Sequence, residues 1–265
     1  MILVLAVAMD GVDFRNALQF LGEITNSGSL MTSQVLRSIG FLILERGLPP
    51  GTPRPEPLPG SVFDPATYDL PIITEMVPGA WTDVVVRGDP ALEPAYVAAA
   101  RRLVDRGAVV ISSDCGFSIR HQAAVAASVN VPVVMSSVLL LPTLLRQLPG
   151  RAKIALLTYD SSHFGQDLLG VDDPADRARV IIGGIEGTKY WHDGLKRPWP
   201  PIDVAAVEAD VGACLTRLRK THPEIAAVLF ECATFPLVAP AIRRIAKLPV
   251  YDITILCRMT IESVA

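Results

Sequence analysis

Two of the four cysteines end apolar segments that have the composition of buried strands. Cys115 closes the segment AVVISSDC, and Cys232 closes the segment IAAVLFEC. In open parallel α/β sheets, ligands bind outside the carboxyl ends of the strands, where loops lead into helix N-termini. The unpaired N–H groups and the dipole of a helix N-terminus favour an anion, so both thiols are candidates for ionisation. The neighbouring Asp114 and Glu231 oppose ionisation by repulsion and could instead relay protons.

Two thiols on opposite sides of one cleft can perform carbon-acid chemistry. One thiolate removes a proton from a carbon next to a carboxylate or carbonyl, and the other thiol returns a proton to the opposite face. The result is racemisation or epimerisation without a cofactor, and it requires donors that hold the carboxylate and the developing carbanion. We expect these donors to be the backbone N–H groups of Gly116, Phe117, Ala233 and Thr234 and the hydroxyls of Ser136, Ser137, Thr158 and Thr234. Cys214 and Cys257 are expected to be core thiols, because free cysteine is commonly buried.

Strand and helix patterns alternate along the chain and must position these residues. Strands are predicted over 39–44, 71–77, 108–112, 131–135, 153–158, 179–183, 225–230 and 249–253, and helices over 90–106, 118–128, 203–221 and 236–246. This alternation predicts an α/β fold with parallel sheets and helices on both faces. The segment 49–59 contains six prolines, which exclude helix and central strand. We interpret it as a stiff surface connection or as a wall at a pocket mouth.

The two halves of the chain match at a fixed spacing. When Cys115 is laid on Cys232, a shift of 117 residues, Pro132 also falls on Pro249. The pattern indicates two pseudo-symmetric Rossmann-like halves, residues 36–140 and 141–265, with the active site in the cleft between them. Residues 1–35 match neither half and are expected to be an N-terminal extension, with Met31 as a natural start.

Composition excludes several classes of function. The 265 residues carry 24 Lys and Arg against 27 Asp and Glu, for a net charge of -3, without the basic block that nucleic-acid binding needs. The mean hydropathy of +0.38 is high, but buried parallel strands explain it, and prolines and polar residues interrupt the uncharged run 122–145. We therefore expect no membrane span. No basic residue precedes Arg15, so we expect no secretory signal and predict a cytoplasmic protein with reduced thiols.

The chain lacks the usual motifs for metals and nucleotides. The four histidines have no HxH or HExxH spacing, so no metal site is predicted. No GxGxxG follows a strand, and no GxxxxGK[ST] occurs. The segment WHDGLKRPWPP, residues 191–201, is interpreted as a loop that packs Trp191 and Trp199 on the surface. The alternative is that it covers the cleft, although its spacing does not require this.

From residue 39 to its end, the chain resembles the aspartate/glutamate racemase superfamily of cofactor-independent racemases and their relatives. The resemblance rests on the segments TPRPEPLPGSVFDPATYDLPIITEMVPGA, SSDCGF with VPVVMSS, IALLTYD, and FECATFP with LPVYDI. The superfamily includes hydantoin racemases, maleate isomerases and arylmalonate decarboxylases. The resemblance implies two Rossmann-like halves, catalytic cysteines at Cys115 and Cys232, no cofactor, and commonly a homodimer.

The sequence motifs indicate the superfamily but do not identify the substrate. Amino-acid racemases have Asn and Thr after the first cysteine, where this chain has Gly116 and Phe117, which disfavours aspartate or glutamate. We expect a racemase or epimerase acting on a small carboxylated metabolite, an amino acid or a derivative. The alternatives are a maleate-type isomerase or a decarboxylase that uses one cysteine, and a two-lobed metabolite-binding protein without catalysis.

Overall fold

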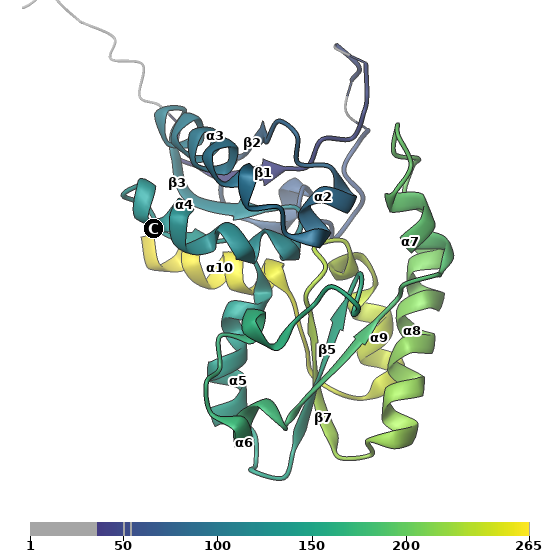
Figure 1. The fold of residues 1–265 in the computed structure, drawn as a ribbon. Coiled ribbons are helices and arrows are strands. Elements are labelled where there is room, and N and C mark those ends of the chain that lie inside the picture. The colour runs from purple at the N-terminus through teal and green to yellow at the C-terminus, as the bar shows by residue number, and fades with distance from the viewer. Residues whose placement is uncertain (1–35, 50, 54, 265) are drawn as a thin grey trace, which may run out of the picture. The chain divides into compact units, whose positions relative to one another are not determined.

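Two parallel sheets form the framework of the chain. The computed structural model describes residues 36–49, 51–53 and 55–264. Within these residues the strands form two four-stranded sheets, in the orders β2-β1-β3-β4 and β6-β5-β7-β8, with helices packed around them (Figure 1). The predicted α/β class with two parallel-sheet halves is therefore confirmed. The expected extension, residues 1–35, lies outside the described residues.

The first half contains the sheet at the top of Figure 1. Its strands are β1 (Ser38–Ile43), β2 (Ile72–Met76), β3 (Ala108–Ser113) and β4 (Val133–Val134). Its helices and 3-10 turns are η1 (Pro65–Thr67), α2 (Thr82–Arg87), η2 (Pro90–Leu92), α3 (Glu93–Asp105), η3 (Gly116–His121), α4 (Gln122–Ser128) and η4 (Ser137–Leu140). Gly88 ends α2 in the left-handed conformation, which a residue without Cβ adopts at little cost.

The second half repeats this plan. Its strands are β5 (Lys153–Thr158), β6 (Val180–Gly184), β7 (Ile225–Phe230) and β8 (Val250–Tyr251). Its helices and 3-10 turns are α5 (Leu141–Gln147), η5 (Gln166–Leu169), α6 (Pro174–Arg177), α7 (Lys189–Gly194), α8 (Val204–Thr221), η6 (Phe235–Val238), α9 (Ala239–Ala246) and α10 (Ile253–Val264). The carboxylate of Asp203 caps α8 by accepting a hydrogen bond from the N–H of Ala206 at 3.1 Å.

The internal repeat extends to the strand register. Ile111 pairs with Val133 in the first sheet, and Val228 pairs with Val250 in the second, each at the 117-residue shift. The β1–β3 and β5–β7 pairs also share a register irregularity at their amino ends. The same local sequence pattern therefore builds the two cysteine-bearing strand ends in the same way.

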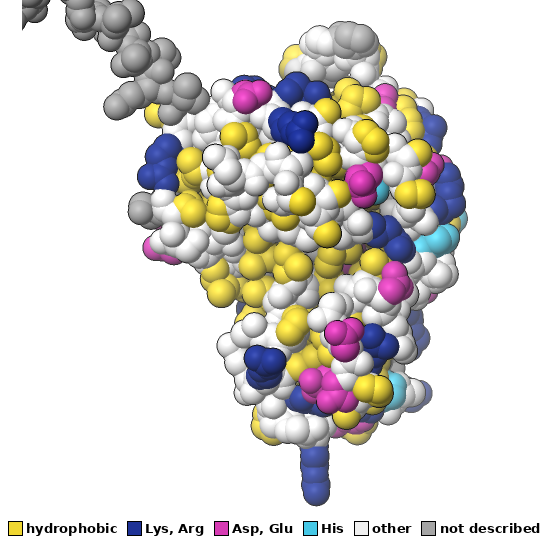
Figure 2. Space-filling model, turned by 60° about the vertical axis from the view of Figure 1, so that its left-hand side comes forward, with side chains coloured by type: hydrophobic (Ala, Val, Ile, Leu, Met, Phe, Trp, Pro, Cys, Tyr) yellow, Lys and Arg dark blue, Asp and Glu magenta, His cyan; other side chains and the backbone are white. Residues whose placement is uncertain are grey.

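The two halves exchange their last helices. α10 follows β8 but packs against β3 and β4 of the first sheet, and η4 follows β4 but contacts β7 of the second. The division at residue 140 thus describes the sheets but not the final helix. One hydrophobic core runs through both halves, and Figure 2 shows apolar side chains gathered across the middle of one face, between the upper and lower lobes.

The structure corrects some sequence-based boundaries. The predicted strand 249–253 ends at Tyr251, and α10 begins at Ile253. The segment 191–201 is not wholly a loop, because α7 covers Lys189–Gly194. These elements are short or lack a clear apolar period, so their sequence signal was weak.

Candidate active site

A narrow pocket lies between the carboxyl ends of β3 and β7. Its lining includes Cys115 and Cys232, each of which is half-buried. The aromatic residues in the lining are Phe117, Tyr159, Tyr190 and Trp199. The free volume is about 30 Å³, roughly the space of one water molecule. A substrate therefore enters only after side chains or the two halves move apart.

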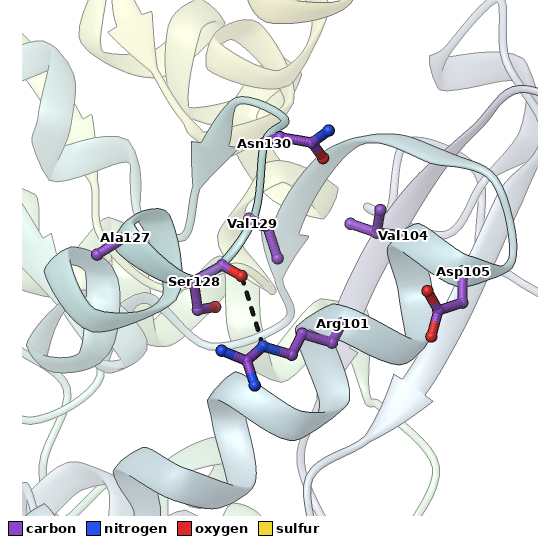
Figure 3. Close-up of a pocket in the computed structure, with 7 residues that line it drawn as sticks. All are labelled: Arg101, Val104, Asp105, Ala127, Ser128, Val129 and Asn130. Atoms are coloured by element: carbon purple, nitrogen blue, oxygen red, sulfur yellow. Dashed lines mark hydrogen bonds between the residues drawn. The ribbon is translucent and has the colours of Figure 1, made fainter.

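A larger hollow lies at the opposite edge of the first sheet. It has a volume of about 330 Å³ and lies between the end of α3 and the segment that leads into β4 (Figure 3). The Nε of Arg101 donates a hydrogen bond of 3.5 Å to the carbonyl of Ser128 across it. Its lining is Arg101, Val104, Asp105, Ala127, Ser128, Val129 and Asn130. This lining includes no cysteine or other strong nucleophile, and ligands of such sheets bind at the carboxyl edge. The cysteine pocket is therefore the candidate active site.

A buried hydroxyl chain fixes the turn that carries Cys115. The backbone N–H of Cys115 donates to the Ser113 hydroxyl at 3.3 Å. That hydroxyl donates to Ser118 at 2.9 Å, and the Ser118 hydroxyl lies 2.9 Å from the Tyr96 hydroxyl. The N–H of Phe117 also favours the thiolate of Cys115 and lowers its pKa. The thiol thus projects from a turn that is anchored in the core.

More donors surround Cys232 than Cys115. The N–H and hydroxyl of Thr234 and the N–H of Phe235 all favour the Cys232 thiolate and lower the pKa of the thiol. The Tyr190 hydroxyl donates to the Thr234 hydroxyl at 2.7 Å and so orients it. Of the two thiols, Cys232 therefore has the better-prepared site for a negative charge.

Burial nevertheless raises the pKa of both thiols. Burial raises the pKa of Cys232 to about 12, and the neighbouring Glu231 raises it as well. Burial also raises the pKa of Cys115 well above its usual value, with further contributions from Glu231, Asp114 and Cys232. The backbone donors at the two turns lower the pKa of each thiol, as expected for helix N-termini. Desolvation and the neighbouring carboxylates outweigh this effect and raise the pKa values overall.

The first carboxylate of the site, Asp114, is paired. It accepts a hydrogen bond from the Leu44 N–H at 3.0 Å and from an Arg46 Nη at 2.8 Å. The Arg46 guanidinium lies over the ring of Trp199, with 4.3 Å between Cζ and the ring centroid. Backbone bonding reinforces the contact, since the Trp199 N–H donates to the Arg46 carbonyl at 3.0 Å. Arg46 is thus a cation beside the pocket, held between two residues that line it, Asp114 and Trp199.

The second carboxyl, Glu231, is only half satisfied. Its Oε2 accepts a hydrogen bond from the Thr158 hydroxyl at 2.9 Å. Its Oε1 is buried without a hydrogen-bond partner, and the residue is 1% exposed. Burial raises the pKa of Glu231 to about 7, against smaller lowering effects of Thr158, the Tyr159 N–H and Arg120. Glu231 therefore changes charge near neutral pH.

The structure brings together some of the predicted donors and separates others. Gly116, Phe117 and Thr234 line the pocket with the cysteines, whereas Thr158 reaches it only through Glu231. The Ser136 hydroxyl caps η4 through the Val138 N–H, and the Ser137 hydroxyl donates to the Phe230 carbonyl. Both serines and Ala233 are buried outside the pocket lining. Both serine hydroxyls are thus engaged in hydrogen bonds within the chain.

The pocket lining also contains residues that the sequence analysis did not assign to the site: Leu44, Thr82, Val86, Tyr159, Tyr190 and Trp199. Arg46 lies beside this lining, over the ring of Trp199. Tyr159 directly follows β5 and was open to prediction, because it occupies a strand end like those of the cysteines. Tyr190 and Trp199 belong to the segment around α7, which reaches the pocket only through its tertiary path.

Among the described residues no group of three or more His, Cys, Asp or Glu is arranged to hold a metal ion. None of the described helices is both long and apolar enough to cross a bilayer.

Comparisons with known proteins give two kinds of relative. No protein-family model matches the chain. It is 32% identical over 206 residues to a dimethylsulfoniopropionate lyase from Durusdinium sp. clade D, covering 74% of this chain and 67% of the relative. It is 27% identical over 232 residues to dimethylsulfoniopropionate lyase 5 of Emiliania huxleyi, covering 84% of this chain and 44% of the relative. The chain thus spans about half to two thirds of the length of these relatives.

Solved structures share the fold at low sequence identity. A glutamate racemase from Francisella tularensis in complex with D-glutamate has a TM-score of 0.52 and 12% identity, with 87% of this chain and 81% of that chain covered. The glutamate racemase from Aquifex pyrophilus has a TM-score of 0.52 and 14% identity, with 86% and 84% covered. The resemblance of the sequence to the aspartate/glutamate racemase superfamily is confirmed at the level of the fold. The named relatives and neighbours are enzymes. The chain belongs to the dimethylsulfoniopropionate lyase family and has the fold of the aspartate/glutamate racemase superfamily.

Proposed function

We propose that the chain is a cofactor-independent lyase that cleaves dimethylsulfoniopropionate or a similar sulfonium carboxylate. The observation that carries this proposal is the composition of the pocket: two thiols lie beside aromatic side chains and the carboxyl of Glu231, whose Oε1 has no hydrogen-bond partner. Aromatic faces and a carboxylate bind onium cations. Both curated relatives described above carry this substrate in their name.

The pocket offers a partner for each end of such a zwitterion. The substrate carboxylate pairs with the Arg46 guanidinium, whose side chain is 30% exposed and lies over the ring of the pocket residue Trp199. The dimethylsulfonium group packs against Tyr159 or Tyr190 and is attracted by Glu231. A dicarboxylic amino acid would place a second carboxylate near Glu231 and Asp114, which repel it. The charges of the pocket thus favour a cationic substituent over an acidic one.

The reaction follows from acid–base chemistry at the carbon next to the carboxylate. The Cys232 thiolate takes a proton from that carbon, and the electron pair forms a carbon–carbon double bond. The bond between the β-carbon and sulfur then breaks, and the sulfide leaves with its electron pair. The products are dimethyl sulfide, acrylate and a protonated thiol, so atoms and charge balance. We assign the base to Cys232 because three donors surround its sulfur.

The substrate itself helps to ionise the thiol. Burial raises the pKa values of the thiols and so favours their protonated form. The positive charge of a bound sulfonium favours the thiolate instead. A unit charge about 5 Å from a thiolate stabilises it by about 3 kcal/mol at an effective dielectric constant of 20. An uncharged analogue lacks this effect. Reactivity is thus linked to the presence of the onium group.

The test is incubation of the purified protein with dimethylsulfoniopropionate in D2O. Gas chromatography of the headspace detects dimethyl sulfide, and proton NMR detects acrylate. We expect both products in equal amounts, and no reaction with the uncharged thioether acid that lacks one methyl group. Absence of both products, with intact fold, would exclude the lyase proposal.

A racemase or epimerase is the second candidate function, and the retained pair of cysteines favours it. Two-base inversion requires an acid/base group on each face of the substrate, and Cys115 and Cys232 line one pocket. A panel of single enantiomers of amino acids and hydantoins, analysed by chiral chromatography in D2O, tests this function. Inversion with deuterium incorporation, without sulfide release, would support racemisation instead of elimination.

A further inference from the structure

We propose that Glu231 accepts the proton of the catalytic thiol, so that a carboxyl–cysteine pair, and not a cysteine alone, is the base of this site. This inference deepens the proposed lyase function and rests on it for the reaction step. It concerns a residue at the end of β7, directly before Cys232.

The position of the carboxyl between the two cysteines is the first argument. Glu231 precedes Cys232 in the chain, and its Oε1 would lie 2.5 Å from a Cβ added at Gly116, the residue after Cys115. The electrostatic effect of Glu231 raises the pKa of both thiols, which shows that it acts on both. Glu231 and the two cysteines line the same pocket.

The second argument is the free oxygen. Thr158 occupies Oε2 at 2.9 Å, whereas Oε1 is buried and has no hydrogen-bond partner. A buried polar atom without a partner destabilises the folded chain, so such an atom calls for an explanation. An acceptor that is kept free for a proton explains both its burial and the missing partner.

The third argument is that this carboxyl suits proton exchange near neutral pH. The titratable and charged groups that face Glu231 are Asp114, Cys115 and Arg120 from the first half and Tyr159 and Cys232 from the second. Burial dominates and raises the pKa of Glu231 to about 7. A base with a pKa near the working pH is the most effective proton acceptor.

The proton balance of a turnover requires such a group. In the resting site, Glu231 is a carboxylate and Cys232 is a thiol. When the substrate binds, the S–H bond breaks and an O–H bond forms at Glu231, which leaves a thiolate. The thiolate takes the substrate proton, and elimination releases sulfide and acrylate. The carboxyl then gives its proton to water as the site opens, so one proton leaves per turnover.

The experiment compares wild type, Glu231→Gln, Glu231→Asp and the control Glu262→Gln, which makes the same change on the exposed face of α10. The rate of alkylation of Cys232 by iodoacetamide is followed by peptide mass spectrometry from pH 5 to 10. In wild type we expect the logarithm of this rate to rise with pH, level off near pH 7, and rise again in alkali, because the pair shares one proton. In Glu231→Gln the plateau disappears, and alkylation at pH 8–9 is faster than in wild type because the repulsion is gone.

Turnover is expected to change in the opposite direction. Dimethyl sulfide release by Glu231→Gln at pH 8 falls by at least about 10-fold, because the bound substrate separates the thiol from water and no carboxylate is left to take its proton. Iodoacetamide, in contrast, reacts with thiolate that forms by loss of the proton to water. The kcat/KM of this variant loses the inflection near pH 7. Glu231→Asp keeps the inflection, and Glu262→Gln matches wild type in both assays. A merely structural role would lower turnover without moving the inflection.

Two results would overturn the assignment of Glu231. One is a wild-type alkylation profile without a break near pH 7, and the other is a break that persists in Glu231→Gln. The alkylation assay needs no substrate. If wild type releases no sulfide but shows the plateau that Glu231→Gln lacks, then the lyase proposal fails while the coupled carboxyl–cysteine pair stands.

Discussion

Gly116 and Glu231 lie in contact across the pocket, from opposite halves of the chain. A Cβ added at Gly116 would lie 2.1 Å from the carbonyl oxygen of Glu231 and 2.5 Å from its Oε1. Real Cβ atoms do not approach other atoms so closely, so only glycine fits there. This contact sets how closely the cysteine-bearing turn after β3 approaches the end of β7.

Gly116→Ala is therefore expected to displace Glu231. The clash with backbone costs roughly 1–3 kcal/mol of unfolding free energy, in the range of other overpacking substitutions, and it lowers turnover. Gly212→Ala in α8 is the matched control, because its added Cβ has nothing closer than 3.9 Å. Urea denaturation and sulfide release measure the two effects. Equal stability and turnover of both variants would show that Glu231 and its backbone can move away from the added Cβ without loss of stability or activity.

Serine variants of the cysteines distinguish elimination from inversion. Cys232→Ser is expected to lower kcat by about 100- to 10,000-fold, because a hydroxyl is a far weaker acid than a thiol and supplies almost no ionised base. In a one-base elimination, Cys115→Ser retains more than about a tenth of the activity, whereas two-base inversion loses activity in both variants. Cys214→Ser is the control, since Cys214 is buried in α8 outside the pocket. Full activity of Cys232→Ser would contradict the assigned base.

Arg46→Gln is expected to weaken both substrate binding and the wall of the pocket. Asp114, whose side chain is 1% exposed, loses its partner at 2.8 Å, and the Trp199 ring loses its cation. We expect KM for the carboxylate substrate to rise by about 10-fold, which corresponds to roughly 1.4 kcal/mol. Arg87→Gln removes a more exposed pair with Asp83 and serves as the control. An unchanged KM in Arg46→Gln would assign the substrate carboxylate to another donor.

Glu231 also predicts how stability depends on pH. The pKa of Glu231 is raised to about 7 in the folded chain, above its value in the unfolded chain, so the folded state binds its proton more tightly. The resulting stability is present at low pH and is lost as pH rises through about 7. The loss is on the order of 3 kcal/mol for this group. Glu231→Gln has no carboxyl that ionises at this position and therefore lacks this loss of stability. We expect the difference in unfolding free energy between pH 5 and pH 8 to be smaller in this variant. Urea denaturation at both pH values measures it, and equal differences in the two proteins would contradict the raised pKa.

The sequence alone predicted the repeated framework of the site. Apolar runs before Cys115 and Cys232, and the common 117-residue spacing, sufficed for two parallel sheets and two equivalent strand ends. This worked because buried parallel strands are apolar on both faces and because the ligand edge of such sheets follows from chain direction.

Only the tertiary structure decided the electrostatics and the remaining wall of the pocket. The thiol pKa values depend on how deeply the halves bury them and on the distance to Glu231, neither of which is encoded locally. Trp199 meets Arg46 because the segment after α7 crosses to the other half of the chain. Strand and turn patterns arise from neighbours in sequence, whereas desolvation and charge pairing arise from residues far apart in the chain, such as Arg46 and Asp114, and so require the fold.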